Sequence, residues 1–101
     1  MTEFVGVETV RSWLADGGEI AFLDVREEGQ HGSGHPLLAV NLPYSQLERD
    51  ITRLVPRRSC RIVLLDDADG VTARAARRLE GVGYSDVHIL TGGASAWSAA
   101  G

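Results

Sequence analysis

Short apolar runs alternate with amphipathic stretches along this chain, and this alternation restricts the fold more than any other feature. The apolar runs have the length and composition of strands covered on both faces, and they are EIAFLDV (19–25), LLAVNLP (37–43), RIVLLD (61–66) and DVHIL (86–90). Because helical segments separate these runs, the strands should lie side by side in one sheet with helices on both faces. The sequence therefore predicts an α/β fold around a mostly parallel central sheet.

The intervening segments have the spacing of amphipathic helices. Apolar residues recur three and four positions apart in VETVRSWLADGG (7–18), YSQLERDITRLV (44–55) and GVTARAARRLEGVG (70–83). Glycines end the first and third segments, and Pro56 follows the second. A Gly-Gly turn and a short helix that contains Trp97 should follow the last strand.

Length and charge narrow the class of protein. A chain of 101 residues is the size of one domain, so residues 1–101 are expected to form a single unit. The formal charge is −4, with ten arginines and no lysine, which does not favour nucleic acid or an anionic membrane as a partner. The N-terminus has neither a basic start nor a long apolar run, so a cytoplasmic location is expected.

The loop after the third predicted strand carries three aspartates, Asp66, Asp67 and Asp69, directly before a predicted helix. In parallel sheets ligands bind at the carboxyl ends of the strands, where the loops after Val25 and Leu65 should lie. A helix N-terminus favours an anion, and here the chain supplies its own. The aspartates can therefore act as helix caps and turn formers, or form an acidic surface that docks a basic partner.

Two sequence signatures resemble those of the rhodanese-like domain family. FLDVREEGQHGSGHPLLAVNLP resembles the first signature, a hydrophobic strand, then D-V-R-E, G-H and a strand ending in N-x-P. The matching residues are Asp24, Val25, Arg26, Glu27, Gly34, His35, Ala39, Asn41 and Pro43. GYSDVHILTGGASAW resembles the closing signature, and its matching residues are Gly83, Tyr84, Val87, Leu90, Gly92, Gly93 and Trp97. The resemblance implies the three-layer rhodanese fold over nearly the whole chain.

In active members of that family, a cysteine ends the central strand and opens a six-residue loop. Backbone N–H groups of the loop stabilise the persulfide that carries sulfur from thiosulfate or another donor to an acceptor. In this sequence the corresponding loop is Asp66, Asp67, Ala68, Asp69, Gly70 and Val71. Asp66 falls at the cysteine position, and Val71 falls where a basic residue often closes the loop. The resemblance therefore implies an inactive domain with no catalytic residue, in which Asp66 takes the place of the sulfur or Asp67 or Asp69 caps the helix.

Other residues of the signatures have structural interpretations. An acid and a guanidinium at a strand end can pair with each other, so Asp24 and Arg26 are expected to anchor the loop that follows. The resemblance gives His35 a scaffold role, and Trp97 should fill the core under the last turn. His31, His35 and His88 share no metal-ligand spacing, and no metal or cofactor is expected.

Three other chemistries fit the sequence less well. Cys60, the one cysteine, lies six residues before Asp66, roughly 20 Å away along an extended strand, and should be inert. DADGVT (67–72) resembles the opening motif of haloacid-dehalogenase-like phosphotransferases, but no lysine follows it. If the aspartates are aligned with the calcium-binding loop of an EF-hand, Leu65 and Ala76 fall at ligand positions. Neither side chain can bind calcium, so an EF-hand calcium site is excluded.

The resemblance also indicates a context. Tandem rhodaneses commonly pair an active domain with an inactive one, and aspartate is a frequent occupant of the vacant position. We therefore expect a structural, regulatory or docking role beside another rhodanese domain, in the same chain or in a partner chain. The alternative is an active thiosulfate sulfurtransferase that uses a thiol outside the usual loop.

Overall fold

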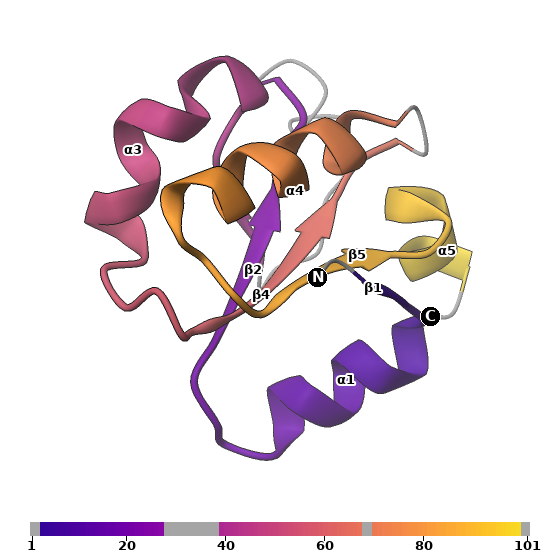
Figure 1. The fold of residues 1–101 in the computed structure, drawn as a ribbon. Coiled ribbons are helices and arrows are strands. Elements are labelled where there is room, and N and C mark those ends of the chain that lie inside the picture. The colour runs from indigo at the N-terminus through magenta and orange to yellow at the C-terminus, as the bar shows by residue number, and fades with distance from the viewer. Residues whose placement is uncertain (1–2, 28–38, 68–69, 100–101) are drawn as a thin grey trace.

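The computed structural model describes residues 3–27, 39–67 and 70–99 (Figure 1). The elements follow in chain order as β1 (Glu3–Val5), α1 (Val7–Ala15), β2 (Ile20–Asp24), β3 (Val40–Asn41), the 3-10 helix η1 (Tyr44–Gln46), α3 (Leu47–Leu54), β4 (Arg61–Leu65), α4 (Val71–Val82), β5 (Val87–Leu90) and α5 (Gly93–Ala99). The five strands form one sheet in the order β1-β5-β4-β2-β3, and every neighbouring pair is parallel. The predicted α/β class is confirmed.

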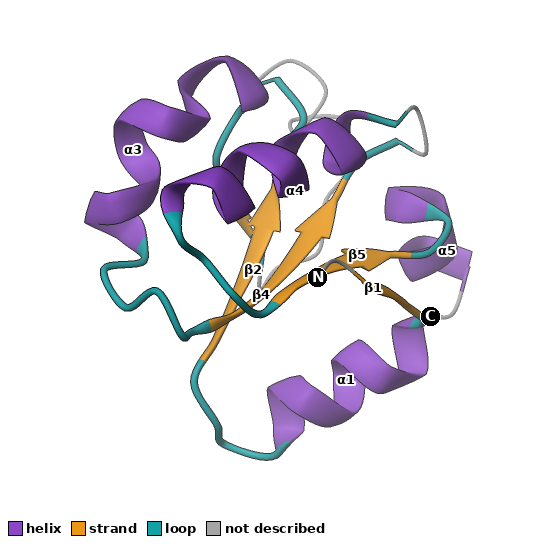
Figure 2. Ribbon diagram, in the orientation of Figure 1, coloured by secondary structure: helices purple, strands orange, loops and turns teal. Residues whose placement is uncertain are grey.

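Helices cover the sheet on both faces and make three layers (Figure 2). α3 and α4 pack on one face, where Ile62 and Leu64 of the central strand belong to a core shared with Leu79. α1 and α5 lie on the other face, where Val63 and Leu65 pack with Val10. Because side chains alternate along a strand, the apolar run of β4 supplies both cores. This explains why the continuous apolar run predicted as the strand at residues 61–66 lies in the centre of the sheet.

The N-terminal strand β1 was not predicted from the sequence. It has three residues at the edge of the sheet, and Phe4 leaves 68% of its surface exposed. Such a short, half-exposed segment has no apolar periodicity that could be recognised. Two boundaries also differ from the prediction. β3 contains only Val40 and Asn41, and the segment predicted as one helix from residue 44 begins with the 3-10 turn.

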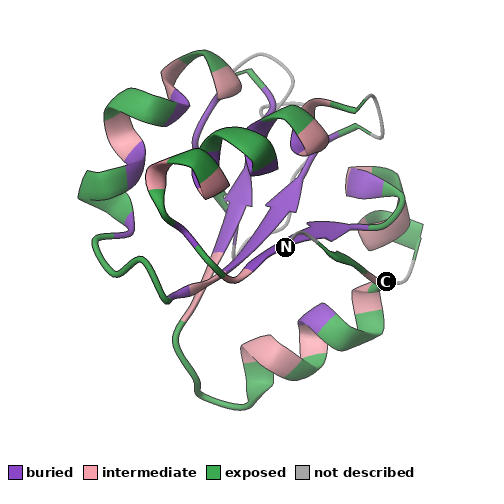
Figure 3. Ribbon diagram, in the orientation of Figure 1, coloured by how far each residue is buried: buried purple, intermediate pink, exposed green. Residues whose placement is uncertain are grey.

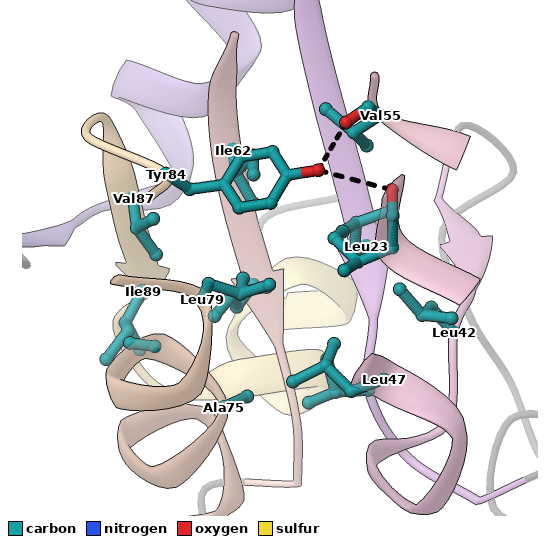
Figure 4. Close-up of a cluster of buried hydrophobic side chains, with 14 of the residues drawn as sticks. Leu23, Leu42, Leu47, Val55, Ile62, Ala75, Leu79, Tyr84, Val87 and Ile89 are labelled. Carbon is teal, nitrogen blue, oxygen red and sulfur yellow. Dashed lines mark hydrogen bonds between the residues drawn. The ribbon is translucent and has the colours of Figure 1, made fainter. Parts of the chain in front are cut away.

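The core under α3 and α4 includes one aromatic residue with a polar end. Tyr84 is 2% exposed, and its hydroxyl donates its one hydrogen to the carbonyl oxygen of Val55 at the end of α3 (Figure 4). The carbonyl oxygen of Ile51 lies 3.4 Å from the same hydroxyl. Leu79 of α4 lies in the same cluster, and the inner sides of α3 and α4 are buried while their outer sides are exposed (Figure 3). None of the helices in the described ranges is long and apolar enough to span a bilayer.

Shortening Leu79 should be costly, because the side chain is 1% exposed and fills space between α4 and the sheet. We expect Leu79→Ala to lower the free energy of unfolding by about 2–5 kcal/mol. The control is Leu54→Ala in α3, where the leucine is 38% exposed. That change should lower the free energy by less than about 1 kcal/mol. Urea unfolding measures both, and equal losses would contradict the core assigned here.

Candidate functional site

The carboxyl ends of β2 and β4 lie side by side at one edge of the sheet. Asp24 is opposite Leu65 in the parallel register, and the amide of Val25 donates to the carbonyl oxygen of Leu65 at 3.0 Å. The two loops that the sequence singles out, after Val25 and after Leu65, therefore start next to each other. In open parallel sheets this is the edge where binding sites form.

A buried arginine joins these two loops. The guanidinium of Arg26 donates through Nε and Nη2 to the carboxylate of Asp24, at 2.8–3.1 Å, and through Nη1 to Asp67 at 3.0 Å. The side chains of Arg26 and Asp24 are 5% and 0% exposed. The hydrogen bonds to Asp24 raise the pKa of Arg26 above its ordinary value, so the cation is permanent. The contact with Asp24 orients the guanidinium, and the charge-assisted contact with Asp67 joins the β2 loop to the β4 loop.

Asp66 lies one residue beyond β4 and is turned toward the start of α4. The residue is 3% exposed, and its Oδ2 accepts hydrogen bonds from the amide of Thr72 at 3.1 Å and from the Thr72 hydroxyl at 3.0 Å. Gly70, the N-cap of α4, has φ +88 and offers no side chain, so the Asp66 carboxylate satisfies a free amide of the first turn. The helix dipole favours an anion at this position.

The backbone of the same loop is tied to the opposite face of the sheet. The amide of Ala94 in α5 donates to the carbonyl oxygen of Asp66 at 2.8 Å. Val71, the first residue of α4, is half-buried and packs against the core under α3 and α4. The family resemblance implies a basic residue at this position in active relatives. This chain has an apolar side chain there instead.

Two further residues shape the β2 loop, and the sequence analysis gave them no role. Asn41 donates from Nδ2 to the carbonyl oxygens of Asp24 and Arg26, both at 2.9 Å. Glu27 accepts from the hydroxyl of Ser45 at 2.7 Å and from its amide at 3.3 Å. Both belong to the first signature, so their match to the family pattern was the available signal. Thr72 contacts Asp66, and the only sequence signal for it was its position at the start of a predicted helix.

The remaining predicted residues divide between the core and the segments outside the described ranges. Trp97 of α5 is half-buried, with its ring 5.0 Å from that of Phe22. His35, Ala68 and Asp69 lie outside the described residues. The loop residues that the structure brings together are thus Asp24, Arg26, Asp66 and Asp67.

Cys60 lies at the opposite end of β4 from Asp66 and is 5% exposed. Burial, and next the charge of Glu19, raise the pKa of its thiol above the ordinary value. The hollow beside it, about 290 Å³, is lined by the three carboxylates of Asp16, Glu19 and Asp86 and by the guanidinium of Arg61. A protonated thiol among carboxylates is a weak nucleophile toward an anionic sulfur donor.

The fold is that of a sulfurtransferase-family domain, and comparison with known proteins agrees. The family model of the rhodanese-like domain matches residues 7–100. The chain belongs to the rhodanese-like domain family. No curated protein sequence gives a significant match.

Several solved structures are similar to this chain. The thiosulfate sulfurtransferase from Pseudomonas aeruginosa is 44% identical with a TM-score of 0.92, over 99% of this chain and 19% of that one. The Alr3790 protein from Anabaena sp. is 27% identical with a TM-score of 0.84, over 96% and 87% of the two chains. A human single-domain sulfurtransferase, 22% identical with a TM-score of 0.81 over 95% of each chain, shares the fold. This chain spans about a fifth of the Pseudomonas protein.

Removing the cation from the joined loops should destabilise the domain. In Arg26→Met the buried carboxylate of Asp24 loses the guanidinium and keeps the hydrogen bond from the amide of residue 26 at 3.0 Å, and we expect the free energy of unfolding to fall by about 3–5 kcal/mol. The control is Arg53→Met on α3, where the exposed arginine pairs with Asp50 at 3.4 Å. Exposed pairs contribute about 0–1 kcal/mol. Denaturant unfolding compares the two variants, and an Arg26→Met protein as stable as Arg53→Met would show that the pair does not hold the loops.

Proposed function

We propose that this domain transfers no sulfur by itself and has a structural, regulatory or docking role in a sulfurtransferase. The observation that carries the proposal is the Asp66 carboxylate, which is buried at the end of the central strand and bound to an amide of the first turn of α4. We assign to Asp66 the position at which active relatives carry the cysteine. An oxygen anion then takes the hydrogen bonds that would otherwise stabilise a persulfide.

The chemistry of the side chain supports this proposal. Sulfur transfer from thiosulfate requires a thiolate that attacks the outer sulfur, forms a new S–S bond and releases sulfite, with the bonding electron pair leaving on the sulfite. A carboxylate forms no corresponding persulfide. The negative charge of Asp66 also repels an anionic donor that approaches the loop. Both the nucleophile and the binding of the donor are therefore lost at one residue.

The length of the similar protein from Pseudomonas aeruginosa supports the part of the proposal in which this domain works beside a partner domain. This chain is similar to about a fifth of a protein named as a thiosulfate sulfurtransferase. We propose that the present domain works beside another rhodanese-like domain, in the same chain or in a partner chain. Thiosulfate as the donor of that neighbour and a cytoplasmic location are parts of the same proposal.

The isolated chain should form thiocyanate from thiosulfate and cyanide only at the uncatalysed rate, because it has no activated thiol in the loop. The Cys60→Ser variant is the control and should give the same rate. Turnover in the unmodified chain that disappears in Cys60→Ser would replace this proposal with the alternative, an active sulfurtransferase that uses a thiol outside the loop.

Placing a thiol at the end of β4 tests whether the anion site remains. In a Cys60→Ser background, Asp66→Cys with Val71→Arg should give a thiol whose pKa lies at least about one unit below the roughly 8.5 of a free cysteine. The pH dependence of thiolate ultraviolet absorbance measures this pKa, and slow thiocyanate formation should accompany it.

The matched control keeps Val71→Arg and the Cys60→Ser background but moves the thiol away from the loop. In Ser12→Cys the thiol lies on the exposed side of α1, far from the end of β4. Its pKa should stay close to that of a free cysteine. If the two thiols titrate alike, the end of β4 is not a preserved anion site.

A further inference from the structure

Positive charge is concentrated on the helices of one face of the sheet. The segments 47–60 and 71–83, which contain α3, the connection to β4 and α4, carry seven of the ten arginines and three of the fourteen acidic residues. These segments therefore have a formal excess of four positive charges in a chain whose total is −4. The outer sides of α3 and α4 are exposed (Figure 3), so this charge lies at the surface.

Four of these seven arginines are paired with carboxylates. Arg49 and Arg53 contact Asp50, Arg57 contacts Glu19, and Arg78 contacts Glu48. The other three are Arg58, Arg74 and Arg77, which are exposed and have no ion pair within the described ranges. We call these three the open arginines. They are the cations of this face that have no carboxylate partner among the described residues.

Contacts with aromatic rings and with the backbone hold two of the open arginines in place. The guanidinium of Arg58 lies 5.3 Å from the centre of the Tyr84 ring, and its Nε donates to the carbonyl oxygen of Val82 at 3.0 Å. The guanidinium of Arg74 lies 5.7 Å from the centre of the Tyr44 ring. Cation–π contact and a backbone hydrogen bond reduce the entropy that a guanidinium loses on binding, while its terminal N–H groups stay available.

The open arginines lie along α4. Arg74 and Arg77 are one turn apart on the helix, and Arg58 contacts its last turn through Val82. From Arg74 to Val82 the helix rises roughly 12 Å, so the three guanidinium groups form a short row rather than one pocket. Guanidinium forks bind carboxylates in a bidentate manner, and a row of them suits a surface with several carboxylates.

We propose that the open arginines form a docking surface for a carboxylate-rich surface of a partner protein. A protein partner fits better than a nucleic acid, because the rest of the chain carries a formal charge of −8 against the +4 of the segments 47–60 and 71–83. A long polyanion would extend into that negative field, whereas a compact acidic patch would contact only α4 and its surroundings. The proposal goes beyond the proposed function and does not depend on Asp66.

Binding to a fluorescent peptide of about ten residues, rich in glutamate, tests the charge complementarity by anisotropy at low salt. The triple variant Arg58→Ala, Arg74→Ala, Arg77→Ala should weaken binding by about tenfold or more. The control triple Arg49→Ala, Arg53→Ala, Arg57→Ala removes the same charge from the same face but only from paired arginines. It should weaken binding by less than about threefold.

Three results would overturn the inference. They are no measurable binding of the peptide by the unmodified domain, equal losses in the two triple variants, and tighter binding of a single-stranded oligonucleotide of the same length. Both triple variants change exposed side chains, and unfolding curves check that they remain folded. The peptide measurement involves no sulfur transfer, so its failure leaves the proposed function unchanged, and the reverse also holds.

Discussion

The structure depends on one buried cation at the ends of the two central strands. Arg26 places its guanidinium between Asp24, on its own strand end, and Asp67, 41 residues further along the chain. Without this guanidinium, the carboxylates of Asp24 and Asp67 would lie at neighbouring strand ends with no arginine between them. With it, the described parts of the β2 and β4 loops are held together. The arrangement of the candidate site follows from this pairing.

In the proposed function, Asp66 is the residue that decides whether the loop can transfer sulfur. Its carboxylate binds the amide and the hydroxyl of Thr72, and its carbonyl oxygen binds α5. A site at a helix start that favours an anion can hold a thiolate, a persulfide or a carboxylate, but only the sulfur anions can transfer sulfur. The proposed loss of activity therefore needs no change in the fold. Because a carboxylate can take the place of a thiolate at this site, the strand ends and the first turn of α4 can keep the family's structure while the activity is lost.

The sheet and most helices could be predicted from the sequence because each element is long enough to show its own periodicity. β4 supplies side chains to both cores, and the alternation with α3 and α4 dictates parallel strands. β1 could not be predicted, since three residues at a sheet edge carry no pattern. Family resemblance singled out Asp24, Arg26 and Asp66. The contacts of Asp67 with Arg26 and of Thr72 with Asp66 depend on register and on the turn at Gly70, which a linear pattern does not contain.

The most direct test of the account is the mass of each cysteine-containing peptide after incubation with a sulfane sulfur donor. A persulfide adds about 32 Da to the peptide that carries it. The account predicts that the unmodified domain gains no such mass, and that Asp66→Cys with Val71→Arg gains it on the peptide containing position 66. An added sulfur on the unmodified domain, or an engineered thiol at position 66 that stays unmodified, would contradict the claim that a carboxylate occupies a persulfide site.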